Sequence, residues 1–314
     1  MATSTRWYGA VETGGTTCVC AIGQGPADVQ KSVRIPTTTP AETLSQIIDF
    51  FRQARPNIST LGVGTFGPVD LSPSSSTFGH LLQTPKREWS HIDLKGQLQQ
   101  ALRLPVVLDT DVNVAARAEY HMGAAQSVDT FLYLTVGTGI GGSLMVEGKG
   151  LRGLLHPEMG HIHVPRASND TFQGACPYHG TCLEGLASAP AIEARWGIAP
   201  NKLPDDHAAW PMQAYYLAQA CASFVYTFSP ERIILGGGVM QRQSLFPMIR
   251  NRFRDLFSTY LTLPELTQNV GRYIVPPALG SHAGIRGALA LAQSGARNGS
   301  MFGDPSSDES PSYS

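Results

Sequence analysis

Short apolar runs alternate with glycine-rich turns and amphipathic stretches along most of the chain. Residues 7–13 and 18–22 are β-type runs joined by the glycine and threonine residues 14–17, a pattern that predicts a hairpin. A helical pattern over residues 41–54 and a strand-like run over 61–66 follow. The first part of the chain is therefore predicted to alternate strands and helices.

The alternation continues beyond residue 100. Residues 105–109 predict a buried strand, which runs into polar residues 110–113 and an alanine-rich helical stretch to about residue 120. Polar residues at the end of a strand are well placed for chemistry. Residues 131–136 and 143–146 predict a second hairpin around a glycine turn.

The last third of the chain also alternates predicted helices and strands. A dense apolar stretch over about residues 211–228 predicts a helix, residues 232–235 a strand, and a further helix is expected soon after residue 239. Hairpins in both halves predict an α/β fold with mixed sheets. No short repeat period is present, which argues against a solenoid. Two related halves of the chain remain possible.

Residues 304–314 are mostly Ser, Pro and acidic residues. This composition predicts a disordered tail.

Composition narrows the class of protein. With 314 residues, 42% of them hydrophobic, the chain can bury a large core and is not a disordered protein. A formal net charge of -1 argues against a nucleic-acid partner bound through a broad basic field. No segment resembles a membrane span or a signal peptide, so we expect no membrane partner and a cytoplasmic location. Five cysteines are too few and odd in number for a disulfide framework.

Four glycine-rich turns, near residues 14, 67, 138 and 237, each follow an apolar strand. Glycine lets backbone N–H groups approach an anion without a Cβ in the way, so such turns can cradle phosphate. Any one of them alone is more often a tight hairpin turn, but nearby threonine hydroxyls add donors. None matches a P-loop or a Rossmann dinucleotide fingerprint.

The segment 109–113, Asp-Thr-Asp-Val-Asn, is a second candidate for chemistry. A carboxylate at the end of a strand can accept a proton from an alcohol, while a nearby Asn amide fixes a neighbouring hydroxyl. The alternative is a helix N-cap, because Asp and Asn commonly precede an alanine-rich helix.

A third candidate is the spacing Cys-x2-His-x2-Cys formed by Cys176, His179 and Cys182. Three such ligands on one short loop suit a tetrahedral zinc ion, and His161 or His163 could supply the fourth. The alternative is a pair of free thiols beside surface histidines. We expect zinc, because the rest of the chain is poor in cysteine.

Six segments together resemble the sugar kinases of the ROK (repressor, open reading frame, kinase) family, and most of all its bacterial-type, zinc-containing fructokinase branch. They are residues 12–16, 109–113, 135–142, 156–161, 176–185 and 235–239. The resemblance runs from about residue 7 to about 295. Many ROK glucokinases use three cysteines in the zinc loop, so His179 favours the fructokinase branch. Glu12 and Thr17 depart from the family, in which Asp and a longer basic residue are common at these places.

The resemblance implies an actin-like ATPase fold of the hexokinase type (ribonuclease H-like), with two α/β domains closing over sugar and ATP. It implies an N-terminal domain over residues 1–120, completed by a helix near 283–296, and a larger domain over 121–282 with a zinc loop at 156–184. The disordered tail would then cover residues 297–314.

The resemblance also assigns site residues. Asp111 would be the general base that takes the proton from the sugar C6 hydroxyl. Asn113, Glu158, His161 and Glu184 would bind the sugar hydroxyls. The zinc ligands would be His161, Cys176, His179 and Cys182. ATP would be bound by Gly14, Gly15, Thr16, Thr17, Gly137, Thr138, Gly139, Pro190, Gly236, Gly237 and Gly238.

These residues imply phosphorylation of D-fructose to fructose 6-phosphate by Mg-ATP, with zinc as a structural ion and a homodimer as the assembly. Glucose, mannose or an N-acylated aminosugar is the first alternative substrate, because single hydroxyl contacts decide such preferences. A catalytically silent sugar-binding protein is a second alternative, against which Asp111 argues. A DNA-binding repressor is not expected, because only about a dozen residues precede Glu12.

Overall fold

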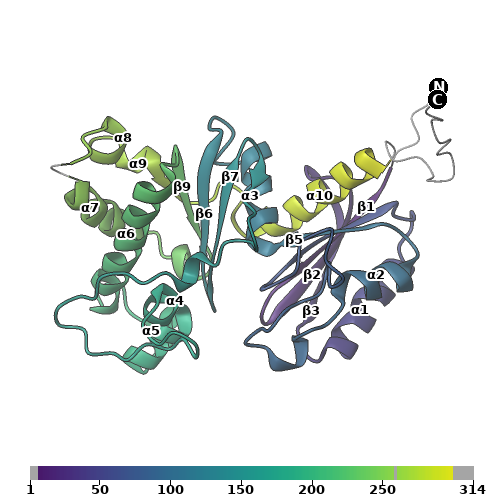
Figure 1. Cartoon of the computed structure of the whole chain (residues 1–314), viewed down its shortest axis with the longest axis horizontal. Coiled ribbons are helices and arrows are strands. Elements are labelled where there is room, and N and C mark those ends of the chain that lie inside the picture. Colours follow the sequence, from purple (N-terminus) through teal and green to yellow (C-terminus); the bar gives the residue numbers. More distant parts are fainter. Residues whose placement is uncertain (1–5, 258–259, 300–314) are drawn as a thin grey trace, which may run out of the picture. The chain divides into compact units, whose positions relative to one another are not determined.

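The computed structural model describes residues 6–257 and 260–299, the side chains as far as residue 296 (Figure 1). Its described parts form two compact units. The first unit is Met1–Asp111 with Ala288–Ser314, and the second unit is Val112–Gly287. The boundary between the two units lies after Asp111. The resemblance to the family implied a boundary after residue 120.

The first unit is built on a five-stranded mixed sheet of order β3-β2-β1-β4-β5. The first three strands are antiparallel, and β4 and β5 continue the sheet in parallel with β1. The strands are β1 (Tyr8–Thr13), β2 (Thr17–Gly25), β3 (Asp28–Pro36), β4 (Thr60–Thr65) and β5 (Val106–Thr110).

Helices cover both faces of this sheet. The helices are α1 (Pro40–Arg52), α2 (Leu94–Leu102), the short 3-10 helix η1 (Arg87–Trp89) and α10 (Ala283–Gly299). Thr39 caps α1, which buries Leu44, Ile47 and Phe51 at helical spacing. Leu61 and Val63 of β4 share that core, whereas a Cβ on the intervening Gly62 would collide with the α10 backbone. Because neighbouring strand residues face opposite ways, α10 covers the other face of the sheet.

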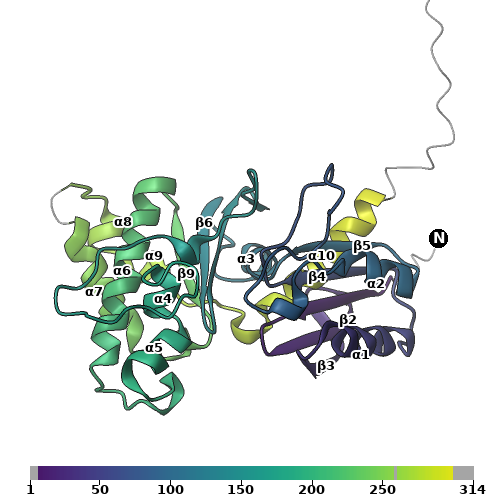
Figure 2. The same ribbon diagram turned by 60° about the horizontal axis from the view of Figure 1, so that its bottom comes forward.

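The second unit contains a five-stranded mixed sheet of order β10-β9-β6-β7-β8. Its strands are β6 (Thr130–Val136), β7 (Ile140–Val146), β8 (Lys149–Gly150), β9 (Arg232–Gly236) and β10 (Ile274–Val275). Its helices are α3 (Asp111–Met122), α4 (Leu183–Ala187), α5 (Ala189–Trp196), α6 (Ala209–Phe228), α7 (Leu245–Phe257), α8 (Pro264–Thr267) and α9 (Val270–Tyr273), with 3-10 turns η2 (Met159–His161), η3 (Pro200–Lys202), η4 (Val239–Gln241) and η5 (Gly280–His282). Figure 2 shows α6 and α7 beside one another within this unit, and both contribute buried aromatic rings to its core.

The two sheets have the same topology. Counted from β3 and from β8, each has three antiparallel strands followed by two that run parallel to the third. The predicted α/β class with mixed sheets and both predicted hairpins are confirmed. The turn of the second hairpin is tighter than predicted, since β7 begins at Ile140 and not at residue 143.

The C-terminal helix is longer than the sequence suggested. Its backbone is helical to Gly299, which differs from a tail that starts at residue 297. Residues 300–314, and with them the predicted disorder, lie outside the described residues. Among the described helices, none is at once long enough and apolar enough to cross a membrane.

Candidate functional site

The carboxyl edge of the first sheet gathers several of the predicted residues. Three parallel strands end side by side at Thr13, Thr65 and Thr110, which are paired in register and buried. The Thr13 hydroxyl donates to Thr65 Oγ1 at 2.8 Å. Asp111 follows the third of these strands and the Gly14 turn follows the first. The two therefore lie at the same edge of one sheet, where ligands of α/β proteins bind.

The first glycine turn, residues 14–17, is held in shape from both sides. The Gly14 N–H donates to the Thr17 carbonyl at 3.0 Å, closing the turn. Thr37, which follows β3, donates its hydroxyl to the Gly14 carbonyl at 2.8 Å and its N–H to the Thr16 carbonyl at 3.0 Å. These carbonyls are thus occupied, and they are directed toward Thr37.

Two carboxyl groups act on one another at this edge. The pKa of Glu12 is raised from 4.5 to about 7, mainly by burial and also by the Asp111 charge, while the Arg34 guanidinium opposes both. Glu12 and Arg34 lie in one register row across β1, β2 and β3, with Val19 between them. A carboxylate at a strand end suits a general base, and carboxylate oxygens are the ligands that Mg²⁺ prefers.

The second unit contains a pocket of about 810 Å³ beside the glycine turn at residues 137–139, which is called the second turn below. Its lining includes Gly137, Thr138 and Gly238 from the predicted ATP-binding set. Gly139, Gly236 and Gly237 lie close to these residues in the sequence and Pro190 follows the lining residue Ala189, but none of the four is part of the lining. The other lining residues are Ala189, Pro200, Asn201, Asp205, Trp210, Val239, Gln241, Arg242, Gln243 and Ser244.

Backbone contacts fix the position of this turn. The Gly137 N–H donates to the Gly139 carbonyl at 2.9 Å, and the Gly137 carbonyl accepts from Ala189 at the start of α5 at 2.8 Å. Gly237 has φ +91°, and a Cβ there would collide with the backbone of Val136. Only glycine lets the end of β9 lie this close to β6.

One wall of the pocket was not predicted from the sequence. The Arg242 guanidinium lies 4.0 Å from the centre of the Trp210 ring, donates to the Leu203 carbonyl at 2.8 Å and pairs with Asp205. The residues come from three separate segments, and no motif joins them. A flat aromatic and guanidinium surface beside glycine-rich turns suits a purine nucleotide.

The predicted sugar-binding residues of the second unit lie on α3, η2 and α4. Asn113 is buried on α3, against Gly150 of β8. Glu158 is half-exposed, with its carboxylate 3.6 Å from Nδ1 of the buried His156. Glu184 accepts the Ile140 N–H at 2.9 Å, which connects α4 to the start of β7.

His161 is placed by close packing of η2 on β7. A Cβ on Gly160 would collide with the Ile140 carbonyl, so a glycine is required where the two backbones meet. The His161 N–H donates to the Glu158 carbonyl at 3.0 Å. Glu158, His161 and Glu184 therefore belong to segments that contact the first residue of β7.

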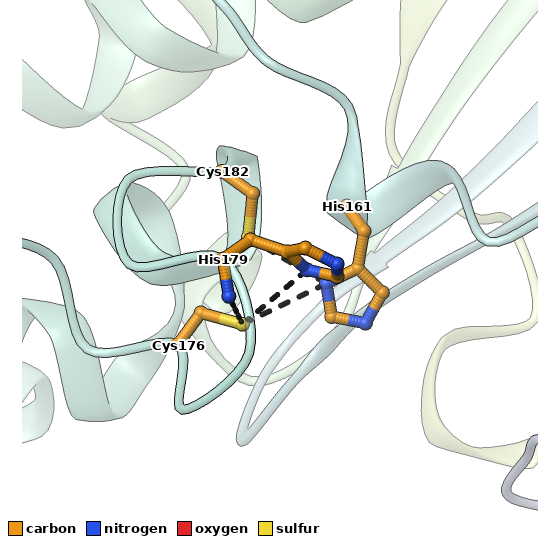
Figure 3. Close-up of side chains that lie close together, drawn as sticks. All are labelled: His161, Cys176, His179 and Cys182. Atoms are coloured by element: carbon orange, nitrogen blue, oxygen red, sulfur yellow. Dashed lines mark hydrogen bonds between the residues drawn. The ribbon is translucent and has the colours of Figure 1, made fainter.

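His161, Cys176, His179 and Cys182 converge as a metal site would require (Figure 3). Nδ1 of His161 lies 3.9 Å from Sγ of Cys176 and 3.5 Å from Sγ of Cys182. Sγ of Cys176 lies 3.8 Å from Nδ1 of His179, and all four donor atoms lie within 4.8 Å of one another. Zinc bound tetrahedrally by two thiolates and two imidazoles separates nitrogen from sulfur by about 3.5 Å. The donor set therefore fits zinc, with His161 and not the exposed His163 as the fourth residue.

Other contacts also hold the loop that carries the Cys and His cluster. Sγ of Cys182 also accepts the Gly185 N–H at 3.5 Å and so caps α4. Arg195 of α5 donates to Asp170 at 3.0 Å and to the Leu186 carbonyl at 3.0 Å, and the Tyr216 hydroxyl donates to Asp170. Burial raises the pKa of Asp170, but these partners and the Phe172 N–H outweigh it and hold the pKa below its usual value.

The fold, the glycine turns and the Cys and His cluster can be compared with known protein families. One family matches nearly the whole chain. The sequence profile of the ROK family matches residues 8–295, and the chain belongs to this family. The resemblance inferred from the motifs is confirmed.

Particular relatives narrow the comparison. The chain is 45% identical to a putative fructokinase of Bacillus subtilis over 90% of this chain and 94% of the relative. It is 41% identical to a fructokinase of Pediococcus pentosaceus over 92% and 99%. Among solved structures, a ROK family glucokinase of Streptomyces griseus in complex with glucose and AMPPNP superposes with a TM-score of 0.71 at 26% identity, over 92% of this chain and 99% of that one. These likenesses support the predicted fructokinase branch and the hexokinase-type fold.

Proposed function

We propose that this protein is a kinase that transfers the γ-phosphoryl group of Mg-ATP to the C6 hydroxyl of D-fructose. The observation that carries the proposal is the similarity to a putative fructokinase and to a fructokinase over about nine-tenths of the chain. The carboxylates and turns at the sheet edges supply the groups that such a reaction needs.

In the proposed reaction the C6 oxygen of fructose attacks the γ-phosphorus of ATP. A bond forms between these two atoms, and the bond from the γ-phosphorus to the oxygen bridging it to the β-phosphorus breaks. ADP leaves with that oxygen and its electron pair. The hydroxyl proton passes to the Asp111 carboxylate and then to solvent, which leaves fructose 6-phosphate.

The nucleotide is assigned to the pocket of the second unit, with its base against the Trp210 and Arg242 wall. The Gly137–Gly139 turn and the Gly14–Thr17 turn contribute backbone donors toward the phosphates. Mg²⁺ enters with ATP and neutralises phosphate charge. Among the chain's own residues, Glu12 and Asp111 are the carboxylates placed to orient that ion.

Zinc is assigned a structural role at His161, Cys176, His179 and Cys182. With four protein ligands the site is closed, and a closed zinc site stabilises a fold without binding substrate. Because His161 lies on η2 and Cys182 caps α4, a bound ion would hold together two segments that carry the sugar-binding candidates Glu158 and Glu184. Asn113 contributes a third polar group from α3.

The deciding experiment measures ADP release from Mg-ATP with fructose, glucose, mannose and N-acetylmannosamine, ranked by kcat/KM. A clear preference for fructose is expected. Turnover of another sugar alone would overturn the substrate and keep the kinase chemistry, whereas no turnover of any sugar would favour a silent sugar-binding protein. The expected homodimer is checked on the same preparation by sedimentation.

A further inference from the structure

Lys86 is a cation that lies against the first glycine turn. A Cβ built on Gly15 would lie 3.9 Å from Cε of Lys86, so the end of this side chain reaches the turn. Its charge also acts on Cys18, one residue beyond the turn, where it opposes the rise in pKa that burial causes. The end of the Lys86 side chain thus lies beside the middle of the turn, and its charge acts on the residue that follows the turn.

The segment that carries Lys86 is held rigidly next to the turn. Trp89 is fully buried, and its indole N–H donates to the Thr38 carbonyl at 2.9 Å. Its ring meets Phe66 edge to face at 5.6 Å. The Ser90 hydroxyl accepts the Thr84 N–H at 3.1 Å, which closes the segment around Lys86. Thr38 follows Thr37, so the residue that braces the turn and the residue that anchors Trp89 are neighbours.

Lys86 has no anionic partner in the described part of the chain. No ion pair or hydrogen bond of its ammonium group occurs among these residues, although the side chain is half-buried. A partly desolvated cation is stabilised by an anion, and the turn beside it consists of Gly14, Gly15, Thr16 and Thr17, which carry no charge. An uncharged phosphate turn would otherwise rely on backbone and hydroxyl donors alone.

We propose that Lys86 binds the terminal phosphate of ATP at the first turn and stabilises the negative charge on the phosphoryl group during its transfer. This inference rests on the proposed function and extends it by one residue. Lys86 donates hydrogen bonds from its ammonium group and takes no proton, so the atoms and electrons of the reaction balance as written above. A lysine provides a point charge with three donors, which suits a phosphate oxygen.

The test compares K86M, which removes the charge and keeps the length of the side chain, with K86R, which keeps the charge. K86M is expected to lower kcat about 10²- to 10³-fold, with less than about a threefold change in the KM for fructose. K86R is expected to recover part of the loss. The matched control is R87M, which removes an exposed cation one residue away on η1 and should retain wild-type kinetics.

A binding measurement separates failure of this inference from failure of the proposed function. Calorimetry with Mg-ATP and with Mg-ADP should show that K86M weakens ATP about tenfold and leaves ADP nearly unchanged, whether or not fructose is the substrate. An unchanged ratio of the two affinities together with wild-type kcat would overturn the inference. Equal weakening of both nucleotides with a lowered melting temperature would also overturn it, because Lys86 would then only support the fold.

Discussion

The two sheets share one topology and differ in the chemistry at their edges. After β1 the chain turns through residues 14–17, and after β6 it turns through residues 137–139. In the first unit the carboxyl edge also carries Glu12 and Asp111, whereas the matching place after β10 is occupied by Pro276. The second unit has instead the pocket at Gly137 and Thr138 and the cluster of His161, Cys176, His179 and Cys182.

This comparison indicates that the shared strand order places a possible binding turn at the edge of each sheet. The side chains at each edge then determine which chemistry is possible there. Both turns are closed by a backbone hydrogen bond and fixed by a second segment, Thr37 for the first turn and Ala189 for the second. The first edge carries Asp111, the proposed proton acceptor, whereas the carboxylate beside the second turn, Glu184, accepts the Ile140 N–H. Under the proposed function, proton transfer belongs to the first unit, and nucleotide recognition and the zinc-braced loop belong to the second.

The largest effect is expected from D111N, which removes the proton acceptor from the first edge. We expect kcat to fall about 10²- to 10⁴-fold with little change in sugar affinity, because the amide keeps the shape of the side chain and loses its basicity. Rate measurements with fructose and calorimetric binding of fructose check both parts.

The control for this variant is D109N, two residues earlier on the same strand end. Asp109 is buried and accepts the Thr110 N–H at 2.9 Å through its own Oδ1, an interaction that an amide oxygen can make. Wild-type-like turnover by D111N, or an equal loss in D109N, would show that Asp111 is not the specific base.

A loss of stability confined to the second unit is expected from C182S. The serine oxygen can still cap α4, so the change tests the metal and not the cap. We expect the bound zinc to be lost and the free energy of unfolding to fall by several kcal/mol, because metal binding to four ligands adds to folding free energy. Metal analysis and thermal melting measure these changes.

Cys221 offers the matched thiol. It is fully buried on α6 of the same unit and is not one of the four clustered residues, so C221A should keep one zinc per chain. If C182S still binds one zinc per chain, Cys182 is not a ligand and the closed site is wrong.

The smallest effect is expected from E12Q, and it depends on pH. The folded state raises the Glu12 pKa from 4.5 to about 7, so it favours the protonated carboxyl and loses stability as the pH rises through this range. The glutamine variant has no such loss. It should equal the wild type below pH 4.5 and be more stable by about 1 to 3 kcal/mol at pH 8, at about 1.4 kcal/mol per pKa unit.

Chemical unfolding across this pH range, without nucleotide or Mg²⁺, measures the difference. The Asp111 charge is one cause of the raised pKa. In a D111N background the stabilisation by E12Q should therefore shrink. A difference that is constant with pH would mean that Glu12 does not titrate as described.

Much of the fold follows from apolar patterning, and the failures have physical reasons. Strands such as β4 are buried at every residue and therefore predictable, whereas β3 lies at an edge with mostly exposed polar side chains and has no apolar period. Helix α2 is rich in Gln and buries only Leu94 and Leu98, so its amphipathic signal is weak.

Some parts of the candidate site were predictable from the sequence and others were not. The Cys and His cluster was predictable because three of its four residues lie within seven positions of one another. In the structure the fourth residue of the cluster is His161 and not His163. Lys86 and the contact of Arg242 with Trp210 were not predictable. Each depends on segments that meet only after folding, and a single cation in a loop carries no signal of its own.

Under the proposed function, the two roles assigned to Cys182 make the activity of this protein depend on zinc. One sulfur is placed to bind the ion and also to cap α4, whose Glu184 accepts the N–H of Ile140 immediately after the second turn. Loss of the ion would therefore loosen a helix that contacts the residue following the turn 137–139. Under the proposed function, a cell short of zinc would lose the capacity to trap fructose as its phosphate, and its carbohydrate supply would follow its zinc supply.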